Sequence, residues 1–304
     1  MRYLTPILLL PILFSPASAQ TAPNPFLGRW DMTVTTPRGI LVDWLGVSEK
    51  GGVFEVRYQP PGGHVYQVKD CKLDGSRLTL KLEQGVEWEL AVKGDEITGV
   101  QKRGANVEGQ VAGARAPTLN RLEPQAWTVP ERLFNGRDLS GWEPVEAHAA
   151  NHWLVRNNEL INEERGANLK TTRKFDDFRL HIDYNCPEGG NSGIYLRGRY
   201  EVQIEYEPLG ANPPERAMGS IYGFLTPAVI LPRTPGEWES YDIELVGRTV
   251  TVVRDGSTIL DHKEIPGVTG GALDSREGEP GPIYIQGDHT GSLRFRDITV
   301  AVPK

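Results

Sequence analysis

Short runs of alternating hydrophobic and polar residues dominate the chain from Gly28 onward. In Leu78-Thr79-Leu80-Lys81-Leu82 and in Trp88-Glu89-Leu90-Ala91-Val92, every second side chain is apolar. This period of two is typical of strands with one face in a core. Turn sequences such as Lys50-Gly51-Gly52 and Asp74-Gly75 separate the runs. The pattern predicts an all-β protein, and no segment shows a convincing helical period.

Eight strands are expected in the N-terminal part, at Trp30–Thr35, Ile40–Val47, Val53–Tyr58, Val65–Cys71, Arg77–Leu82, Val86–Val92, Glu96–Lys102 and Asn106–Val111. Their regular spacing predicts an antiparallel meander that forms a small β-barrel domain over residues 24–113. The opening Phe26-Leu27-Gly28-Arg29-Trp30 is similar to the Gly-x-Trp start of lipocalin-type barrels. A barrel of this size encloses a small ligand or is filled by its own side chains.

A Gly-, Ala-, Pro- and Arg-rich stretch over residues 114–130 predicts a linker, because it has no periodicity. A second series of strands follows, at Trp153–Arg156, Phe178–Asn185, Ser192–Leu196, Tyr200–Tyr206, Ser220–Gly223, Trp238–Val246, Thr249–Arg254, Ser257–His262, Pro282–Ile285 and Gly291–Ala301. The Asp255-Gly256 hairpin turn and the long alternating runs predict a two-sheet sandwich or jelly roll over residues 131–304.

The N-terminus predicts export. Arg2 precedes the apolar run Leu4–Phe14, and Ala17-Ser18-Ala19 supplies small residues for signal-peptide cleavage. A retained membrane helix would need about 20 apolar residues, and prolines interrupt this shorter run. We therefore expect a signal peptide over residues 1–19 and a periplasmic or secreted mature protein that is not inserted in the membrane.

Composition narrows the classes of partner. The 304 residues are 38% hydrophobic and carry a formal charge of −7 without a basic stripe, so nucleic-acid binding is not supported. Cys71 and Cys186 fall in different predicted domains, which favours two free, buried thiols over a disulfide. No P-loop, GxGxxG, HExxH, GxSxG or EF-hand motif occurs.

Polar side chains alternate along several strands of the second domain. Glu201, Gln203 and Glu205 share one face of their strand, and His181, Asp183 and Asn185 share a face of another. For a single strand, a solvated sheet face explains such alternation. Several such strands together predict a concave polar sheet with aromatic residues, which suits a hydroxyl-rich ligand such as a sugar.

Six segments of the second domain resemble the 3-keto-disaccharide hydrolase family, also described as 3-keto-glucoside 1,2-lyase/3-keto-2-hydroxyglucal hydratase. They are Leu133–Trp142, Phe175–Leu180, Gly189–Ile194, Tyr200–Ile204, Gly219–Tyr222, and Gly281–Gln286 followed by His289 and Phe295–Ile298. The family often has Asp where Glu205 stands and Asn where Asp297 stands. The resemblance implies a concanavalin-like two-sheet fold and leaves the N-terminal barrel unassigned.

The resemblance also implies a substrate and a reaction. The substrate is a 3-keto-sugar or 3-keto-glycoside, and a separate 3-dehydrogenase is the functional partner that oxidises C3 beforehand. The carbonyl acidifies the C2 hydrogen, so a base can start 1,2-elimination of the aglycone, and hydration then gives the 3-keto hexose. No cofactor is certain, although a divalent metal could polarise the keto oxygen.

Ten residues are the candidates for this site. Glu201 is the expected base, His289 the expected acid or metal ligand, and Glu205 a further catalytic carboxylate. A lone histidine is equally often structural or on the surface. The expected substrate-binding residues are Gln203, Arg197, Asn191, Tyr222, Gln286, Asp183 and Trp238. Turn formation by Asn191 and core packing by Trp238 are the alternatives for those two.

Two other classes of function share the same sequence features. A non-catalytic carbohydrate-binding module would bind glycans without turnover, and fold alone does not separate it from an enzyme. A structural or adhesion module of an exported complex would present a shallow face without convergent polar groups.

Overall fold

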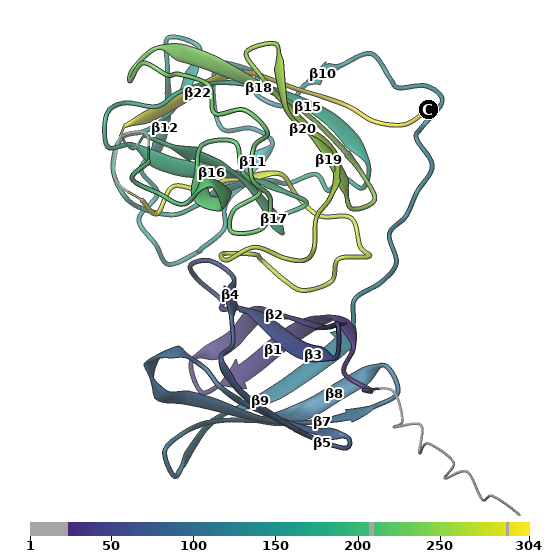
Figure 1. Ribbon diagram of the computed structural model, residues 1–304. Coiled ribbons are helices and arrows are strands. Elements are labelled where there is room, and N and C mark those ends of the chain that lie inside the picture. The colour runs from purple at the N-terminus through teal and green to yellow at the C-terminus, as the bar shows by residue number, and fades with distance from the viewer. Residues whose placement is uncertain (1–23, 207–209, 290–291) are drawn as a thin grey trace, which may run out of the picture.

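The chain forms two all-β domains joined by an extended linker. A computed structural model describes residues 24–206, 210–289 and 292–304. In Figure 1 the N-terminal domain lies below the larger C-terminal domain, and the linker runs along one side of the molecule. The predicted signal peptide lies outside the described residues. Within them, no helix is long and apolar enough to span a bilayer.

The N-terminal domain is one strongly curled antiparallel sheet. Its strands are β1 (Gly28–Thr36), β2 (Gly39–Lys50), β3 (Val53–Gln59), β4 (Tyr66–Gln67), β5 (Asp70–Asp74), β6 (Arg77–Lys81), β7 (Val86–Lys93), β8 (Glu96–Arg103) and β9 (Asn106–Arg115). They pair in the order β4-β3-β2-β1-β9-β8-β7-β6-β5. The predicted meander is therefore confirmed, in the form of a half-barrel whose edge strands β4 and β5 do not pair with each other. Strand β9 continues to Arg115, two residues into the predicted linker.

The alternating residues of the N-terminal domain fill the concave side of this sheet. Leu78, Leu80, Trp30 and Trp88 are all buried there. The indole of Trp88 donates a hydrogen bond of 3.0 Å to Gln101 Oε1. Burial of these large apolar side chains is the main term that stabilises the curled sheet.

The C-terminal domain contains two antiparallel sheets, as the sequence predicts for a jelly roll. The larger sheet pairs β12 (Trp153–Arg156), β13 (Glu159–Asn162), β22 (Leu293–Ala301), β15 (Phe178–Asn185), β18 (Trp238–Val246), β19 (Thr249–Arg254) and β20 (Ser257–Glu264) in that order, with β10 (Glu131–Arg132) on β22. The smaller sheet pairs β11 (Trp142–Pro144), β14 (Leu169–Thr171), β21 (Tyr284–Ile285), β16 (Asn191–Leu196) and β17 (Tyr200–Glu205).

The core of this domain contains the apolar halves of the alternating strands. Ile182 from the larger sheet and Val202 and Ile204 from the smaller one belong to a single buried cluster. In the described residues the helical segments are two short 3₁₀ turns, η1 (Glu83–Gly85) and η2 (Pro214–Arg216).

The two sets of polar residues expected on one concave sheet lie in different sheets. Strand β15, with His181 and Asp183, pairs with β18 and β22, whereas β17 pairs with β16. The expectation of a continuous polar sheet was therefore wrong. Strand pairing places β15 and β17 in different sheets, and the alternation within a strand does not encode its pairing partners.

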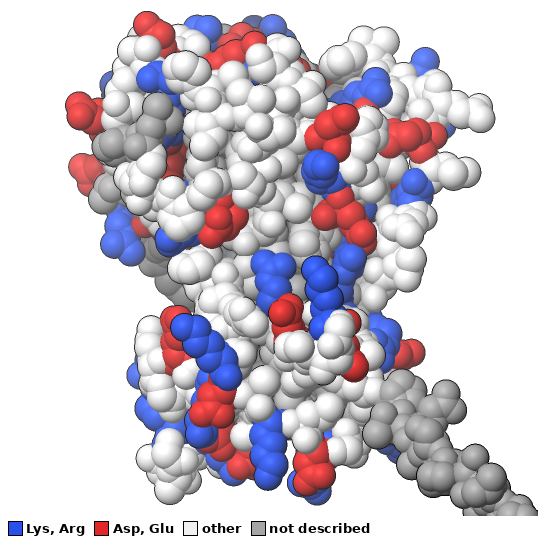
Figure 2. Space-filling model, viewed as in Figure 1, with Lys and Arg blue, Asp and Glu red and all other residues white. Residues whose placement is uncertain are grey.

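The two domains bury side chains against each other. Trp44 of β2 contacts Phe224 edge-on, with 5.2 Å between ring centroids. Nearby, Asp31 of β1 contacts Glu277 of the C-terminal domain, whose Oε2 accepts a 2.9 Å hydrogen bond from Arg248. Burial, and then the charge of Glu277, raise the pKa of Asp31 to about 10. Figure 2 shows charges of both signs interspersed across the face it presents, including the domain junction.

Both cysteines are free, as expected. Cys186 is buried in the C-terminal domain, and Cys71 of β5 is partly buried in the half-barrel. Burial raises the pKa of the Cys186 thiol to about 12, so this group is inert at neutral pH.

Candidate functional site

A polar cavity of about 260 Å³ lies where the smaller sheet of the C-terminal domain meets the N-terminal domain. Strands β16 and β17, the segment after β21 and the Gly270-Gly271 turn supply most of its walls. The loop between β3 and β4 and Tyr222 supply the rest. The lining residues are Pro61, Gly62, Gly63, Asn191, Tyr195, Glu201, Gln203, Tyr222, Gly270, Gly271, Gln286, Asp288 and His289.

Glu201 is the buried carboxylate of this cavity, with 4% of its surface exposed. Its strand alternation places Val202 in the core and the Glu201 side chain on the opposite, cavity-facing side. Gly193 on the adjacent strand leaves the necessary room, because a Cβ atom there would lie 2.7 Å from Glu201 Cγ. The absence of a side chain at position 193 therefore allows the Glu201 carboxylate to lie where it does.

The environment of Glu201 favours its neutral form. Burial raises its pKa to about 8, the Tyr195 hydroxyl partly offsets this rise, and the charges of Asp288 and Glu205 add to it. A carboxylate with such a pKa is a stronger base than an exposed one and is still ionised in part near neutral pH.

Two tyrosines brace one wall. The rings of Tyr195 and Tyr284 stack with centroids 3.9 Å apart. Their hydroxyls donate hydrogen bonds of 2.8 Å to the backbone oxygens of Gly270 and Gly271, respectively. The stack thus holds the glycine turn in place against the cavity.

Amide groups give the cavity its hydrogen-bonding capacity. The side-chain oxygens of Gln203 and Gln286 are buried and have no hydrogen-bond partner among the residues that the structure describes. Buried polar atoms are usually paired, so these two acceptors are available to a ligand that brings donors. Asn191 and Tyr222, in the same wall, add donor groups.

His289 lies at the exposed side of the cavity. Its Nδ1 atom is 2.8 Å from Asp288 Oδ1, and its side chain is 43% exposed. Burial acts to raise the pKa of Asp288, but the hydrogen bond and charge of His289 outweigh it, so that the pKa is lowered. The structure therefore brings Glu201 and His289 into one cavity, from different elements.

The N-terminal domain contributes a wall that the sequence did not reveal. The Pro61 carbonyl accepts a 2.9 Å hydrogen bond from the Gly271 amide. The buried side chain of Gln59 donates to the backbone oxygens of Pro60 and Gly63, at 2.8 and 3.0 Å. The Pro60-Pro61-Gly62-Gly63 sequence indicates a turn, but nothing in it indicates the other domain as its contact.

Four expected site residues do not line the cavity. Glu205 accepts hydrogen bonds from two residues that do line the cavity, Gln203 (3.2 Å) and Asn191 (3.4 Å). Asp183 and Trp238 belong to the larger sheet, where both contact Arg296. Arg197 is the fourth.

The Arg197 side chain is enclosed in the protein, with 0% of it exposed. Its guanidinium pairs with Asp176 at 3.2 Å and donates to the Gly247 carbonyl at 2.6 Å. Arg197 has a φ of 52° in the turn after β16, so it does not continue the alternation of that strand.

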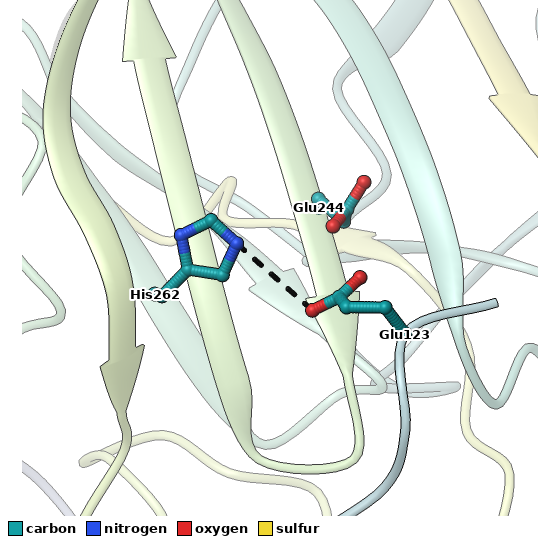
Figure 3. A group of neighbouring side chains, drawn as sticks. All are labelled: Glu123, Glu244 and His262. Carbon is teal, nitrogen blue, oxygen red and sulfur yellow. Dashed lines mark ion pairs between the residues drawn. The ribbon is translucent and has the colours of Figure 1, made fainter. Parts of the chain in front are cut away.

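Within the described residues, the group of three metal-ligating side chains that come together lies elsewhere, on the larger sheet (Figure 3). Glu123 of the linker is 4.0 Å from His262 of β20, and Glu244 of β18 is beside them. Arg179 pairs with Glu244, and Asp261 with His262. The ion pair between Glu123 and His262 attaches the linker to the sheet. In the described part of the cavity, no such group of three donors comes together.

Comparisons with known proteins match the C-terminal domain. The sequence profile of the family described as "3-keto-alpha-glucoside-1,2-lyase-like domain" matches residues 129–301. A search of curated proteins gave no match.

The chain is also similar to solved structures. A candidate glycosyl hydrolase from Parabacteroides distasonis is 31% identical, with 60% of this chain and 92% of that chain covered and a TM-score of 0.49. A second one from the same organism is 17% identical, covers 56% and 92%, and has a TM-score of 0.45. The carbohydrate-binding module CBM66 from Bacillus subtilis is 12% identical, covers 53% and 94%, and has a TM-score of 0.35.

Proposed function

Because this chain belongs to the 3-keto-alpha-glucoside-1,2-lyase-like family, we propose that it cleaves 3-keto-glycosides by 1,2-elimination, with Glu201 as the base. The observation that carries the proposal is the position of Glu201, a buried carboxylate of raised pKa in a polar cavity. The cavity of about 260 Å³ is smaller than the roughly 300–1,000 Å³ typical of drug-sized ligands. It suits one sugar ring.

The first step is proton transfer from carbon. A Glu201 oxygen takes the C2 proton of the 3-keto sugar, and the electron pair of the C–H bond becomes the C2–C3 double bond of an enolate. Negative charge moves to the C3 oxygen, where hydrogen-bond donors stabilise it. Asn191 and Tyr222 supply such donors from the cavity wall.

The second step expels the aglycone. The enolate reforms the C3 carbonyl, a C1–C2 double bond forms, and the C1–O bond breaks with its electron pair on the aglycone oxygen. That oxygen takes a proton from an acid, for which His289 at the exposed side of the cavity is the candidate. Asp288, whose Oδ1 lies 2.8 Å from Nδ1 of this ring, orients the imidazole.

The product of elimination is an unsaturated keto sugar that can be hydrated in the same cavity. Water adds its oxygen to C1 and a proton to C2, which releases the 3-keto hexose. Protonated Glu201 can return the C2 proton, so one carboxyl group serves in both directions. The unpaired amide oxygens of Gln203 and Gln286 accept hydrogen bonds from sugar hydroxyls.

This activity requires a supply of oxidised substrate. A separate 3-dehydrogenase would convert a glycoside hydroxyl to the C3 ketone before cleavage. The apolar N-terminal run and its cleavage sequence support a periplasmic or secreted site of action.

The test is a Glu201→Gln variant assayed on a 3-keto-glucoside. Gln keeps the size of the side chain but cannot accept the proton, so turnover should fall by about 10²- to 10⁴-fold. Asp183→Asn in the larger sheet is the matched control and should keep its rate. Wild-type turnover by Glu201→Gln would contradict the assignment. Saturable sugar binding with no turnover in the wild type would favour a carbohydrate-binding module.

A further inference from the structure

The half-barrel contains a second cavity, separate from the one in the C-terminal domain. Its volume is about 450 Å³, within the roughly 300–1,000 Å³ typical of small-molecule sites. The lining residues are Leu41, Asp43, Tyr58, Pro60, Pro61, Gly62, Gly63, His64, Tyr66, Leu82, Glu83, Gln84, Val86, Gln101 and Arg103. Neither the family match nor the proposed reaction accounts for this cavity, because the matched residues begin at 129.

A buried carboxylate lies in the wall of the half-barrel cavity. Asp43 is 1% exposed and is next to Trp44, which points to the other side of β2 and contacts Phe224. The Tyr58 hydroxyl donates a hydrogen bond to Oδ1 of Asp43. The second oxygen, Oδ2, has no partner in the described part of the chain.

An unpaired carboxylate oxygen in such a place is costly. Transfer of a polar group from water without a compensating hydrogen bond is unfavourable, and more so for a charged one. Burial raises the pKa of Asp43 to about 7 although the Tyr58 hydrogen bond lowers it. A ligand that donates a hydrogen bond to Oδ2 would remove this cost. A carboxylate with only a structural role would not explain why this oxygen lacks a partner.

The other walls indicate what the rest of the ligand must be. Tyr58 and Tyr66 meet edge-on with centroids 5.6 Å apart, and Leu41, Leu82 and Val86 add apolar surface. Aromatic rings pack well against such edge-to-face pairs.

Arg103, a cation that lines the half-barrel cavity, already has partners within the protein. Arg103 pairs with Glu108 at 2.9 Å and donates to the Gln84 carbonyl. An anionic ligand would therefore have to compete with Glu108 for this guanidinium and would face the Asp43 carboxylate. An uncharged ligand avoids both costs.

We propose that the half-barrel cavity binds an uncharged aromatic compound that carries a hydroxyl group, with its rings against Tyr58 and Tyr66 and its hydroxyl donating to Asp43 Oδ2. This site does not depend on the proposed reaction. It is nevertheless next to the cavity of Glu201, because Pro61, Gly62 and Gly63 line both.

The test measures binding to the full chain by titration calorimetry, without any turnover. The probes are 2-naphthol, 2-methoxynaphthalene, which lacks the donor, and glucose, which lacks the rings. We expect saturable binding of 2-naphthol, binding of 2-methoxynaphthalene that is about tenfold or more weaker, as for one lost hydrogen bond to a charged acceptor, and no binding of glucose in the half-barrel.

Two variants locate the site. Leu41→Trp fills the half-barrel cavity and should abolish 2-naphthol binding, whereas Ile40→Trp, at the adjacent 69% exposed position on the other face of β2, should not. Asp43→Asn keeps an acceptor for Tyr58 but replaces Oδ2 with a donor, so it should remove the preference for 2-naphthol over 2-methoxynaphthalene.

Three results would overturn the proposal. They are no saturable binding of 2-naphthol to the wild type, equal effects of Leu41→Trp and Ile40→Trp, and an unchanged preference in Asp43→Asn. If circular dichroism shows that Leu41→Trp does not fold, Asp43→Asn alone decides. Because binding is measured directly, a failure here leaves the elimination assay with Glu201→Gln unaffected.

Discussion

The Glu201 carboxylate packs over Gly193 of the neighbouring strand so closely that a Cβ atom at position 193 would overlap it. Gly193 pairs with Gln203, and Tyr195 with Glu201, across β16 and β17. The close approach is therefore a consequence of strand register. A methyl group added at position 193 would therefore displace the base, although the residue there has no functional group of its own.

A Gly193→Ala substitution should displace the Glu201 carboxylate and reduce kcat/KM on a 3-keto-glucoside by about 100-fold, the effect of a displacement near 1 Å. The backbone at position 193 is not in the left-handed region, so the fold should persist. Steady-state kinetics and circular dichroism measure the two effects.

Gly278→Ala is the control for this change. A Cβ atom at 278 would make an ordinary contact of 3.7 Å with Pro117, outside the cavity of Glu201. Its activity should equal that of the wild type. An unchanged rate in Gly193→Ala would show that the observed packing does not position the base.

The pH dependence of activity should follow the raised pKa of Glu201. Below its pKa of about 8 the carboxyl group is mostly protonated and cannot act as a base, so activity rises with pH. We expect kcat/KM to increase about tenfold per pH unit below this value. A pH–rate profile with the rising limb near pH 4 would contradict the buried environment.

The Tyr195 hydroxyl provides a check on the origin of that profile. This hydroxyl lowers the pKa of Glu201, so Tyr195→Phe should move the rising limb to higher pH. Tyr284→Phe removes the hydroxyl of the stacked partner, which is bonded to Gly271, and should leave the limb where it is. Equal displacement in both variants would indicate a general loosening of the wall instead.

We expect Arg197 to stabilise the fold and not to bind the substrate. Arg197→Ala leaves the Gly247 carbonyl without its 2.6 Å partner and empties a fully buried volume, so we expect a loss of about 3 kcal/mol in the free energy of unfolding. KM for the 3-keto-glucoside should not change, because Arg197 does not line the cavity of Glu201.

Arg179→Ala is the matched control for Arg197→Ala. Its exposed pair with Glu244 should contribute less than about 1 kcal/mol. Denaturant unfolding measures both variants. A selective rise in KM for Arg197→Ala, with stability unchanged, would instead show that Arg197 binds the substrate.

The domain junction should make stability depend on pH through Asp31. Its pKa rises from its usual 3.8 to about 10 in the folded protein, where burial and Glu277 favour the protonated form. Between these values the folded protein holds a proton that the unfolded chain has lost, so stability falls as the pH rises.

Asp31→Asn removes this titration and should stabilise the protein at pH 7. A gain of about 1 kcal/mol corresponds to a rise of roughly 2–4 °C in Tm for a domain of 150–250 residues. Thermal melts from pH 5 to pH 9 should be flatter for Asp31→Asn than for the wild type. A lower Tm of the variant at pH 7 would mean that an ionised Asp31 stabilises the junction.

The local patterns of the sequence predict much of this architecture. Alternation in β17 correctly separates Val202 and Ile204 from Glu201 and Gln203, because the period of a strand is a local property. The same alternation in β15 gives no indication that Asp183 belongs to the other sheet, since partner strands are set by contacts distant in the sequence.

The site of Glu201 was predictable only in part for the same physical reason. The segment with Gly193 and the segment with Glu201 are both short and contiguous, and they carry the family resemblance. Docking of the Pro61 loop onto Gly271 joins residues 210 positions apart in different domains, and no local signal records such a contact. The extra wall from the N-terminal domain therefore appears only in the folded molecule.

The central claim is that cleavage begins with removal of the C2 proton by Glu201. The most direct test compares kcat/KM for a 3-keto-glucoside with hydrogen or deuterium at C2, using the wild-type chain. The account predicts that the deuterated substrate reacts several-fold more slowly, because the C2–H bond breaks in the first step. Equal rates for the two substrates, with the glycosidic bond still cleaved, would contradict it and indicate direct displacement at C1.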